Sequence, residues 1–381
     1  MSGGLLEGVL VLDISQFLSG PFAALRLGDL GARVIKVERP DGGDLCRRLY
    51  LSDTEIGGDS TLFHAINRGK QGFAADFKNP EDIARLKKLI ARADVVIQNF
   101  RPGVIARLGL DYETVKAINP GIAYASITGY GEEGPWAALP GQDLLAQART
   151  GVMWLNGDRG QGPVPFGLAI ADLLAGHSII EGVLAALVGR GRTGRGAHIE
   201  TSLLEALIDF QFEVLTTYLN DGKRRPERSE FRNAHAYLAA PYGVYRTVDG
   251  WLALAMTPLD KLGAVLDLPA IAGLESRAGF TRRDDIKKQI AEHLAGASTA
   301  DWLKRLQPAD IWCAEVLDWP ELFASAAFQR LDILQSLSLA DGPNVRTTRS
   351  PIRVNGARET PRGPAPRIGE HTEEIAREFG L

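Results

Sequence analysis

The residue of this sequence best placed to do chemistry is an aspartate in an apolar run. Asp172 lies in the stretch PVPFGLAIADLLAGHSII, near the expected start of a long helix. A carboxylate at such a position is either a helix cap, which accepts hydrogen bonds from the unpaired amides of the first turn, or a nucleophile. The two roles are compatible, because the same amides stabilise a carboxylate anion.

A carboxylate that attacks a thioester needs no general base. The reference pKa of aspartate is about 3.9, so the side chain stays about 90% ionised at pH 7 even if burial raises its pKa by about two units. The six histidines form no HExxH or HxxxH pair, and the sequence contains no GxSxG turn. His177 and Glu181 lie four residues apart, a spacing typical of a contact along one helix. The sequence therefore indicates neither a zinc hydrolase nor a serine hydrolase.

Four more residues have the chemistry to bind a phosphorylated ligand. Arg39 follows the second expected strand at its carboxyl end, Asn99 and Phe100 follow the third, and Arg107 lies farther along the same segment. Open α/β sheets bind their ligands at this edge. A guanidinium binds phosphate through two hydrogen bonds, an aromatic ring stacks on a base or lines a channel, and an asparagine bonds to an amide. Arginines at strand ends are also common as solvated residues, so residue type alone leaves both interpretations open.

Composition limits the classes of protein to which the chain can belong. With 381 residues, of which 45% are hydrophobic and 24% charged, the chain is long enough for two domains. The net charge of −4 provides no basic surface for nucleic acid, and no apolar run approaches the ~20 residues that span a bilayer. The first residues lack the basic region of a signal peptide, which predicts a cytoplasmic protein. Cys46 and Cys313 are far apart in the sequence, which argues against a disulfide or a thiolate metal site, and no metal is expected.

Alternating strand and helix patterns predict the fold that must position these side chains. Apolar runs at residues 8–14, 33–38, 94–99 and 122–127 are typical of buried parallel strands, and helices are expected at 22–30, at 80–91 and from 111 onward. This order predicts an α/β fold with an open, mostly parallel, Rossmann-like sheet in a large domain and a smaller α+β domain.

The second half of the chain shows other patterns. A long helix is expected at 171–190, because apolar residues recur there at spacings of three and four, and it should stop at the glycine-rich residues 191–196. Asp249-Gly250 predicts a hairpin over 241–256 whose tight turn has positive φ values. Further helices are expected at 202–219, over most of 259–335, and at 370–379.

Seven segments, in order, resemble the signatures of one enzyme family. They include VLDISQFLSGPFAALRLGDLGARVIKVERP, ADVVIQNFRPGV, GQDLLAQARTGVM, the Asp172 segment and TGRGAHIETSLLEA. From Leu5 to Met256, and again near residues 368–372, the chain is similar to the class III coenzyme A transferases, which include formyl-CoA transferase and the related α-methylacyl-CoA racemases. The resemblance implies an interlocked homodimer with its active site between two domains. We expect a large CoA-binding domain at 1–225, a small domain at 226–334, and a C-terminal segment at 335–381 that returns to the large domain.

The resemblance also assigns roles to individual residues, with Asp172 as the catalytic nucleophile. Formyl-CoA transferase has a glutamine and a lysine where this chain has Leu18 and Leu139, which argues against formyl or oxalyl substrates. The resemblance places Gln16 and Phe17 beside the thioester or pantetheine, Arg39 at the adenosine phosphates, Asn99 and Phe100 along the pantetheine arm, and Arg107 near the nucleotide.

The activity that the resemblance implies is transfer of CoA from an acyl-CoA donor to a free carboxylic acid, through an aspartyl mixed anhydride and an aspartyl-CoA thioester. A CoA thioester and a small carboxylic acid are the expected substrates, with no tightly bound cofactor and no nucleic-acid or membrane partner. The main alternative is an acyl-CoA racemase or epimerase acting at the α-carbon. Gln142 stands where such racemases carry a histidine, and an amide cannot exchange protons near neutral pH, which leaves Asp143 and Glu132 as its candidate acid or base. A nicotinamide oxidoreductase would use Glu38 to bind a ribose, but this chain lacks the GxGxxG motif of such enzymes. A noncatalytic CoA-binding protein would have no use for Asp172.

Overall fold

A computed structural model describes residues 4–340, 342–358 and 362–381 of the protein. The chain forms two compact units. The first contains Met1–Ala146, Ala169–Phe210 and Asp332–Leu381, and the second contains Gln147–Leu168 and Gln211–Leu331. These limits differ from the predicted domain ranges, because residues 147–168 and 211–225 fall in the second unit and residues 332–334 fall in the first.

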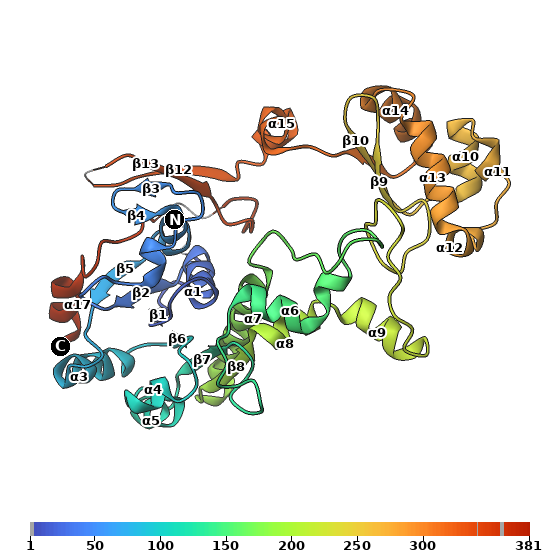
Figure 1. The fold of residues 1–381 in the computed structure, drawn as a ribbon. Helices are drawn as coiled ribbons and strands as arrows, with labels where there is room; N and C mark the ends of the chain where they lie inside the picture. Colours follow the sequence, from blue (N-terminus) through green and yellow to red (C-terminus); the bar gives the residue numbers. More distant parts are fainter. Residues whose placement is uncertain (1–3, 341, 359–361) are drawn as a thin grey trace. The chain divides into compact units, whose positions relative to one another are not determined.

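The first unit is built on a six-stranded parallel sheet with the order β5-β2-β1-β6-β7-β8 (Figure 1). From β1 the chain adds β2 and β5 on one side and then β6, β7 and β8 on the other, which is the strand order of a doubly wound dinucleotide-binding fold. The predicted α/β fold class is confirmed. The strands are β1 (Leu10–Asp13), β2 (Arg33–Glu38), β5 (Gln71–Ala74), β6 (Val95–Gln98), β7 (Ala123–Thr128) and β8 (Ala197–Ser202).

The two edge strands of this sheet, β5 and β8, are not predicted by the sequence patterns. Their sequences are QGFA and AHIETS, and neither is a continuous apolar run. Each has a neighbouring strand on one side only, so its side chains are less deeply buried than those of the central strands. The pattern of a buried parallel strand therefore identifies only the middle of the sheet.

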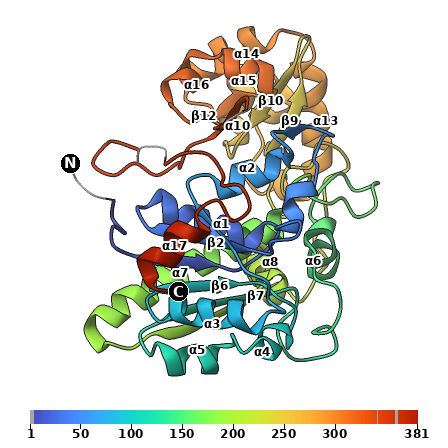
Figure 2. The same ribbon diagram turned by 90° about the vertical axis from the view of Figure 1, so that its left-hand side faces the viewer.

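Helices cover both faces of the sheet (Figure 2). On one face α1 (Ser19–Asp29) and α7 (Ile170–Thr193) pack against each other and against the strands. Asn79 and Asp111 cap α3 and α5, as their places in the sequence predict. On the other face an apolar core is enclosed by α3 (Pro80–Ile90), α4 (Val104–Arg107), α5 (Tyr112–Ile118) and α17 (Thr372–Phe379).

The long helix α7 extends beyond its predicted end. It continues through Gly191 and stops only where Gly194 adopts a left-handed φ of 68°. Gly176 allows α7 to approach α1 closely, because a Cβ at this position would lie 2.8 Å from the Phe22 ring. By length and composition α7 is apolar enough to cross a membrane, contrary to the prediction that no segment reaches this length. One such helix does not indicate a membrane protein, since the core helix of a globular protein meets the same criteria.

The helix predicted at 202–219 is two helices. Ser202 caps α8 (Leu203–Asp209) by accepting a hydrogen bond from the Glu205 amide, and α9 (Phe212–Asn220) begins after a break at residues 210–211. The chain passes from the first unit to the second at this break.

The second unit contains the predicted hairpin, but its turn differs from the prediction. Strands β9 (Gly243–Arg246) and β10 (Trp251–Leu254) are joined by a loop of residues 247–250, and neither Asp249 nor Gly250 has a positive φ. Asp249 instead accepts a hydrogen bond from the Thr299 amide at 2.8 Å, which ties the turn to the start of α14 (Thr299–Leu306). The prediction of a tight two-residue turn was wrong because this side chain bonds to another element.

Other elements complete the two units. The second unit adds β11 (Cys313–Glu315) to its sheet, and its apolar core includes residues of α10 (Leu259–Leu266), α11 (Pro269–Ala272) and α13 (Arg283–Leu294). The unit also contains the short helices α12 (Ala278–Thr281), α15 (Trp319–Ala324) and α16 (Ala326–Arg330). The first unit has two small hairpins and a short helix: β3 (Glu55–Ile56) with β4 (Asp59–Ser60), β12 (Leu334–Ser338) with β13 (Asn344–Thr348), and α2 (Thr61–Asn67).

Candidate active site

The side chains of interest gather where the strand order of the sheet reverses. β1 and β6 are neighbours, yet the crossover that leaves β1 leads to β2 on the opposite side. Ligands of doubly wound sheets bind outside the carboxyl ends of the strands at such a point. The loop that follows β1 contains Gln16 and Phe17, and Asn99 follows β6.

Asp172 lies in the first turn of α7 but does not cap this helix. The capping oxygen comes from Asp143, the first residue of α6 (Asp143–Thr150). Its Oδ1 accepts hydrogen bonds from the amides of Ala171 at 2.6 Å and of Asp172 at 3.4 Å. Because Asp143 satisfies these amides, the carboxylate of Asp172 has no capping role and remains free for chemistry.

The position of Asp143 depends on a close contact between two glycines. A Cβ atom on Gly141 would lie 2.4 Å from the Cα of Gly129, so neither position accommodates a larger residue without a backbone shift. Gly129 directly follows β7, and this contact holds the segment before Asp143 against the end of that strand. The second carboxylate is thereby fixed beside the start of α7.

The surroundings of Asp172 make its carboxyl group unusually basic. Burial, and then the negative charge of Asp143, raise the pKa of Asp172 to about 7, and a hydrogen bond from the Ser19 side chain opposes this rise. This rise in pKa is larger than the rise of about two units for which about 90% ionisation was predicted, so a smaller fraction of the carboxyl groups is ionised at pH 7. The sequence prediction allowed for burial but did not anticipate a second carboxylate nearby. Strongly shifted pKa values of this kind are common at catalytic positions.

Asn99 connects the loop after β1 with the surroundings of Asp172. Its Oδ1 accepts a hydrogen bond from the Gln16 amide at 2.8 Å, and its Nδ2 donates to the Gln16 carbonyl at 2.7 Å. The same Nδ2 lies 3.4 Å from the hydroxyl of Ser19, the residue whose side chain bonds to Asp172. The structure thus brings Gln16, Asn99 and Asp172 together. It adds Ser19, which sequence reasoning missed, and it places Asp143, which the sequence offered only as a possible acid or base of a racemase, beside the start of α7.

Three of the predicted binding residues lie farther along the carboxyl edge of the sheet. Arg39 directly follows β2 and is exposed, with its Nη2 3.3 Å from the Gly43 carbonyl. Arg107 is also exposed, at the end of α4. Phe100 is partly buried, and its ring meets that of Phe77 edge-on with centroids 5.8 Å apart. The two guanidiniums are therefore accessible to phosphate, whereas the Phe100 ring packs on the core.

Two observations concern the chemistry of other enzyme classes, namely nicotinamide enzymes and metalloenzymes. Glu38, which a nicotinamide enzyme would use to bind a ribose, is only 2% exposed and accepts hydrogen bonds from Arg47 at 2.8 Å. Among the residues that the structure describes, no three His, Cys, Asp or Glu side chains form a group able to hold a metal ion.

Comparisons with known proteins agree in one family. Residues 6–372 match the model of CoA-transferase family III. The chain is 34% identical to a succinate–glutarate CoA-transferase of Agrobacterium fabrum, with 98% of this chain and 95% of the relative covered. It is 31% identical to an acetyl-CoA:oxalate CoA-transferase of Acetobacter aceti, with 99% of this chain and 96% of the relative covered. A crystal structure of a CAIB/BAIF family protein from Brucella suis superposes with a TM-score of 0.85 at 32% identity, covering 99% of this chain and all of that one.

Proposed function

Since this chain belongs to CoA-transferase family III, we propose that it transfers CoA from an acyl-CoA donor to a free carboxylic acid with Asp172 as covalent nucleophile. One observation carries the assignment of the nucleophile. Asp143 takes over the capping of α7, so the buried carboxylate of Asp172 remains at the helix start without a capping role. A basic carboxylate in this setting suits nucleophilic attack on an activated acyl group.

The first half of the proposed reaction splits the donor. An oxygen of the ionised Asp172 attacks the thioester carbonyl carbon, the carbon–sulfur bond breaks, and CoA leaves as a thiolate. The product on the enzyme is a mixed anhydride between Asp172 and the donor acid. The thiolate then attacks the aspartyl carbonyl, the anhydride carbon–oxygen bond breaks, and the donor acid departs as a carboxylate. CoA is now held by Asp172 as a thioester.

The second half runs the same chemistry in reverse. The acceptor carboxylate attacks the aspartyl-CoA thioester, which gives a new mixed anhydride and releases the thiolate. The thiolate attacks the acceptor carbonyl and regenerates the Asp172 carboxylate. Proton transfer is not required at any step, so the reaction needs no histidine base beside Asp172. Because water would hydrolyse both intermediates, the reaction requires that the bound substrates exclude it.

We propose succinyl-CoA as donor and a short dicarboxylic acid such as glutarate as acceptor. Relatives named for succinate and glutarate support this choice at 34% and 32% identity over 98% of this chain. The experiment is to incubate the purified protein with succinyl-CoA and glutarate, oxalate or acetate, and to separate the CoA thioesters by liquid chromatography. Formation of the acceptor's CoA thioester is expected. Deuterium exchange at the α-carbon of a branched acyl-CoA, without transfer to any acid, would identify a racemase instead.

We also propose that the protein acts in the cytoplasm as a homodimer. Free Cys46 and Cys313 fit a reducing compartment. Helix α9 has no buried residue in the single chain, and its Phe212 and Leu219 are 68% and 56% exposed, which supports coverage by a second copy. Sedimentation at the mass of one 41.2 kDa chain would contradict the dimer, and recovery of the protein outside the cytoplasmic fraction would contradict the location.

The raised pKa of Asp172 leads to a prediction about pH. We expect kcat/KM to fall as the pH decreases through about 7, because only the ionised carboxylate attacks. Asp143→Asn keeps an oxygen for the amides of α7 but removes the negative charge, so the pKa of Asp172 falls and the acidic limb moves to lower pH. Rates of CoA transfer measured between about pH 5 and 9 test this shift. Asp209→Asn, at an exposed acid on α8, is the control and should keep the wild-type profile. An unshifted profile for Asp143→Asn would contradict the electrostatic role of Asp143.

A further inference from the structure

The backbone of the loop after β1 is held by side chains from other elements. Asn99 binds both the N–H and the carbonyl of Gln16, at 2.8 and 2.7 Å. The N–H of Phe17, the next residue, donates to Asp44 Oδ1 at 3.1 Å. Two side chains that follow two different strands, β6 and β2, therefore fix two successive peptide units. Side chains that bond to the backbone of a turn normally come from the turn itself. Here they come from other elements, so the surroundings of the loop determine its conformation.

The preceding residue of the loop is held in the same way. The N–H of Ser15 donates to Asp13 Oδ1 at 3.1 Å, and its hydroxyl donates to the same oxygen. The carbonyl of Ser15 accepts a hydrogen bond from Lys36 Nζ. From the N–H of Ser15 to the N–H of Phe17, each backbone polar group thus has a side-chain partner.

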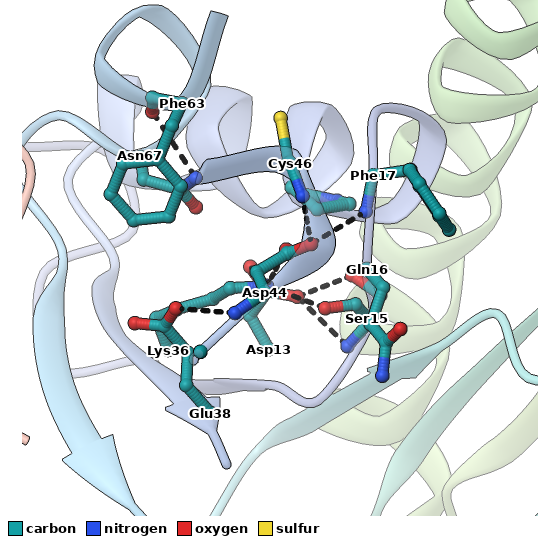
Figure 3. A network of polar contacts seen from close by, with 12 residues as sticks. Asp13, Ser15, Gln16, Phe17, Lys36, Glu38, Asp44, Cys46, Phe63 and Asn67 are labelled. Carbon is teal, nitrogen blue, oxygen red and sulfur yellow. Dashed lines mark hydrogen bonds and ion pairs between the residues drawn. The ribbon is translucent and has the colours of Figure 1, made fainter. Parts of the chain in front are cut away.

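The conformation that these bonds enforce is an unfavourable one. Phe17 has a φ of 61°, in the left-handed region that side chains larger than glycine avoid. An aromatic residue rarely adopts this conformation, and such strain persists only where the surroundings over-determine the backbone. Phe17 is 43% exposed and its ring is directed away from Asp44 and Lys36 (Figure 3), so burial of the ring does not explain its backbone conformation.

Three of the side chains that hold the loop, those of Asp13, Lys36 and Asp44, belong to a buried network of charges (Figure 3). Lys36 and Asp13 are fully buried and Asp44 is 3% exposed. Lys36 Nζ lies 2.8 Å from Asp44 Oδ2 and 3.8 Å from Asp13 Oδ2, and Lys70 Nζ lies 2.7 Å from Asp13 Oδ2. Burial alone would lower the pKa of Lys36, but the negative charges of Asp13 and Asp44 raise it by a larger amount. The net shift is upward, and the lysine stays charged. Opposite charges buried this deeply hold one another in a defined geometry.

A second layer of ionic contacts fixes Asp44 in turn. Glu38 Oε1 accepts hydrogen bonds from the Asp44 amide at 2.9 Å and from Arg47 Nε at 2.8 Å. Arg47, on the short 3₁₀ helix Leu45–Arg48, also binds Glu38 Oε2 at 2.8 Å and Asp59 at 2.7 Å. Asp44 therefore has little freedom to follow a moving loop.

We infer that Asp44 and Asn99 are positioning residues of the proposed transfer, which hold Ser15–Phe17 in one strained conformation beside Asp172. The link to the nucleophile is Ser19, which begins α1 directly after the loop, lies 3.4 Å from Asn99 and hydrogen-bonds to Asp172. The amides of Gln16 and Phe17 are already used by Asn99 and Asp44. The polar groups available to a bound thioester are therefore the side chains of Gln16, in the loop, and of Ser19, at the start of α1. This inference rests on the proposed function and goes beyond it, since it assigns Asn99 to the loop and not to the pantetheine arm.

Asn99→Ala tests the inference. We expect kcat for CoA transfer to fall by about 10- to 100-fold, because a displacement of about 1 Å at a reacting centre has effects of this size, while KM for the acyl-CoA changes less than about threefold. Hydrogen exchange measured by mass spectrometry on the peptide containing residues 10–24 should become at least about tenfold faster. The second readout reports on the loop whether or not the protein transfers CoA.

Asn119→Ala is the matched control. Asn119 lies in the same unit, and its Nδ2 donates to the carbonyls of Ile90 and Ala93 at 3.1 and 2.7 Å while its Oδ1 accepts from the Gly121 amide. It should lower stability about as much as Asn99→Ala and leave kcat unchanged. A rise in KM alone for Asn99→Ala would make Asn99 a direct substrate contact, and unchanged hydrogen exchange would show that it does not hold the loop. Either result overturns the inference, whereas failure of the proposed function would appear as CoA transfer that survives the loss of Asp172.

Discussion

Asp172→Asn is expected to reduce CoA transfer by at least about 10³-fold while changing the affinity for acyl-CoA less than about threefold. Asparagine has nearly the same shape as aspartate, and its amide can keep a hydrogen bond with Ser19, but it cannot form an anhydride. The loss should therefore appear in kcat. Turnover assays and equilibrium binding of CoA measure the two quantities separately. Asp209→Asn, at an exposed site on α8, is the control for a carboxylate-to-amide change in the same unit and should be fully active.

The same variant has a consequence for stability that identifies the origin of the raised pKa. The folded wild type binds the proton of Asp172 more tightly than the unfolded chain does, so the wild type loses stability as the pH rises from 3.8 to about 7. Asp172→Asn lacks this group and should melt at a higher temperature than the wild type, with a larger difference at pH 8 than at pH 5. A variant that retains wild-type turnover, or whose Tm advantage does not grow with pH, would contradict the environment described for Asp172.

Asp13→Ala is expected to lower the free energy of unfolding by about 3–5 kcal/mol, the largest effect on stability of any single substitution considered. Asp13 is fully buried between Lys36 and Lys70, whose Nζ atoms lie 3.8 and 2.7 Å from its Oδ2. Its removal leaves Lys70 without a carboxylate partner in the interior and breaks both hydrogen bonds from Ser15. Urea unfolding at pH 7, followed by circular dichroism, measures the change.

A surface ion pair of the same unit is the control for this prediction. Glu113 lies 3.7 Å from Lys116, and the two side chains are 76% and 50% exposed. Glu113→Ala should change the unfolding free energy by less than about 0.5 kcal/mol, because solvent screens exposed pairs. A change below about 1 kcal/mol for Asp13→Ala would contradict the structural importance of the network.

The contribution of Asp13 to stability also depends on pH. Burial raises the pKa of Asp13, but the two lysines lower it by a larger amount, so the net shift is downward. The contribution of Asp13 is therefore present above pH 3.8 and is lost at lower pH.

The central strands of the fold could be predicted because their burial appears in the sequence. β1, β2, β6 and β7 lie under helices on both faces, and each is close to a predicted apolar run. β5 and β8 are edge strands with mixed sequences, and nothing local distinguishes them from loops. The turn at Asp249 shows the same limit, because its side chain bonds to Thr299, 50 residues away. Local patterns report burial and turn chemistry but not contacts between distant segments.

The candidate site shows which part of a functional site local sequence reveals. Asp172 could be found because a carboxylate in an apolar run is unusual. Asp143 and Ser19 carry no such signal, because an aspartate and a serine at helix starts are common as caps. The relevant fact about Asp143 is that it caps a helix other than its own, and this depends on the contact between Gly129 and Gly141. The resemblance placed Asn99 along the pantetheine arm, whereas its bonds to the Gln16 backbone support the positioning role, and the kinetics of Asn99→Ala decide between the two.

Mass spectrometry of the trapped enzyme tests the central claim most directly. The protein is incubated with succinyl-CoA, quenched with hydroxylamine or borohydride within the first turnovers, and digested, and the peptide that contains Asp172 is sequenced. Hydroxylamine converts an aspartyl anhydride or thioester to a hydroxamate. Borohydride reduces the same anhydride or thioester to an alcohol. We predict that Asp172, and no other carboxylate, carries this modification. An unmodified Asp172 under conditions in which CoA is transferred would contradict the account.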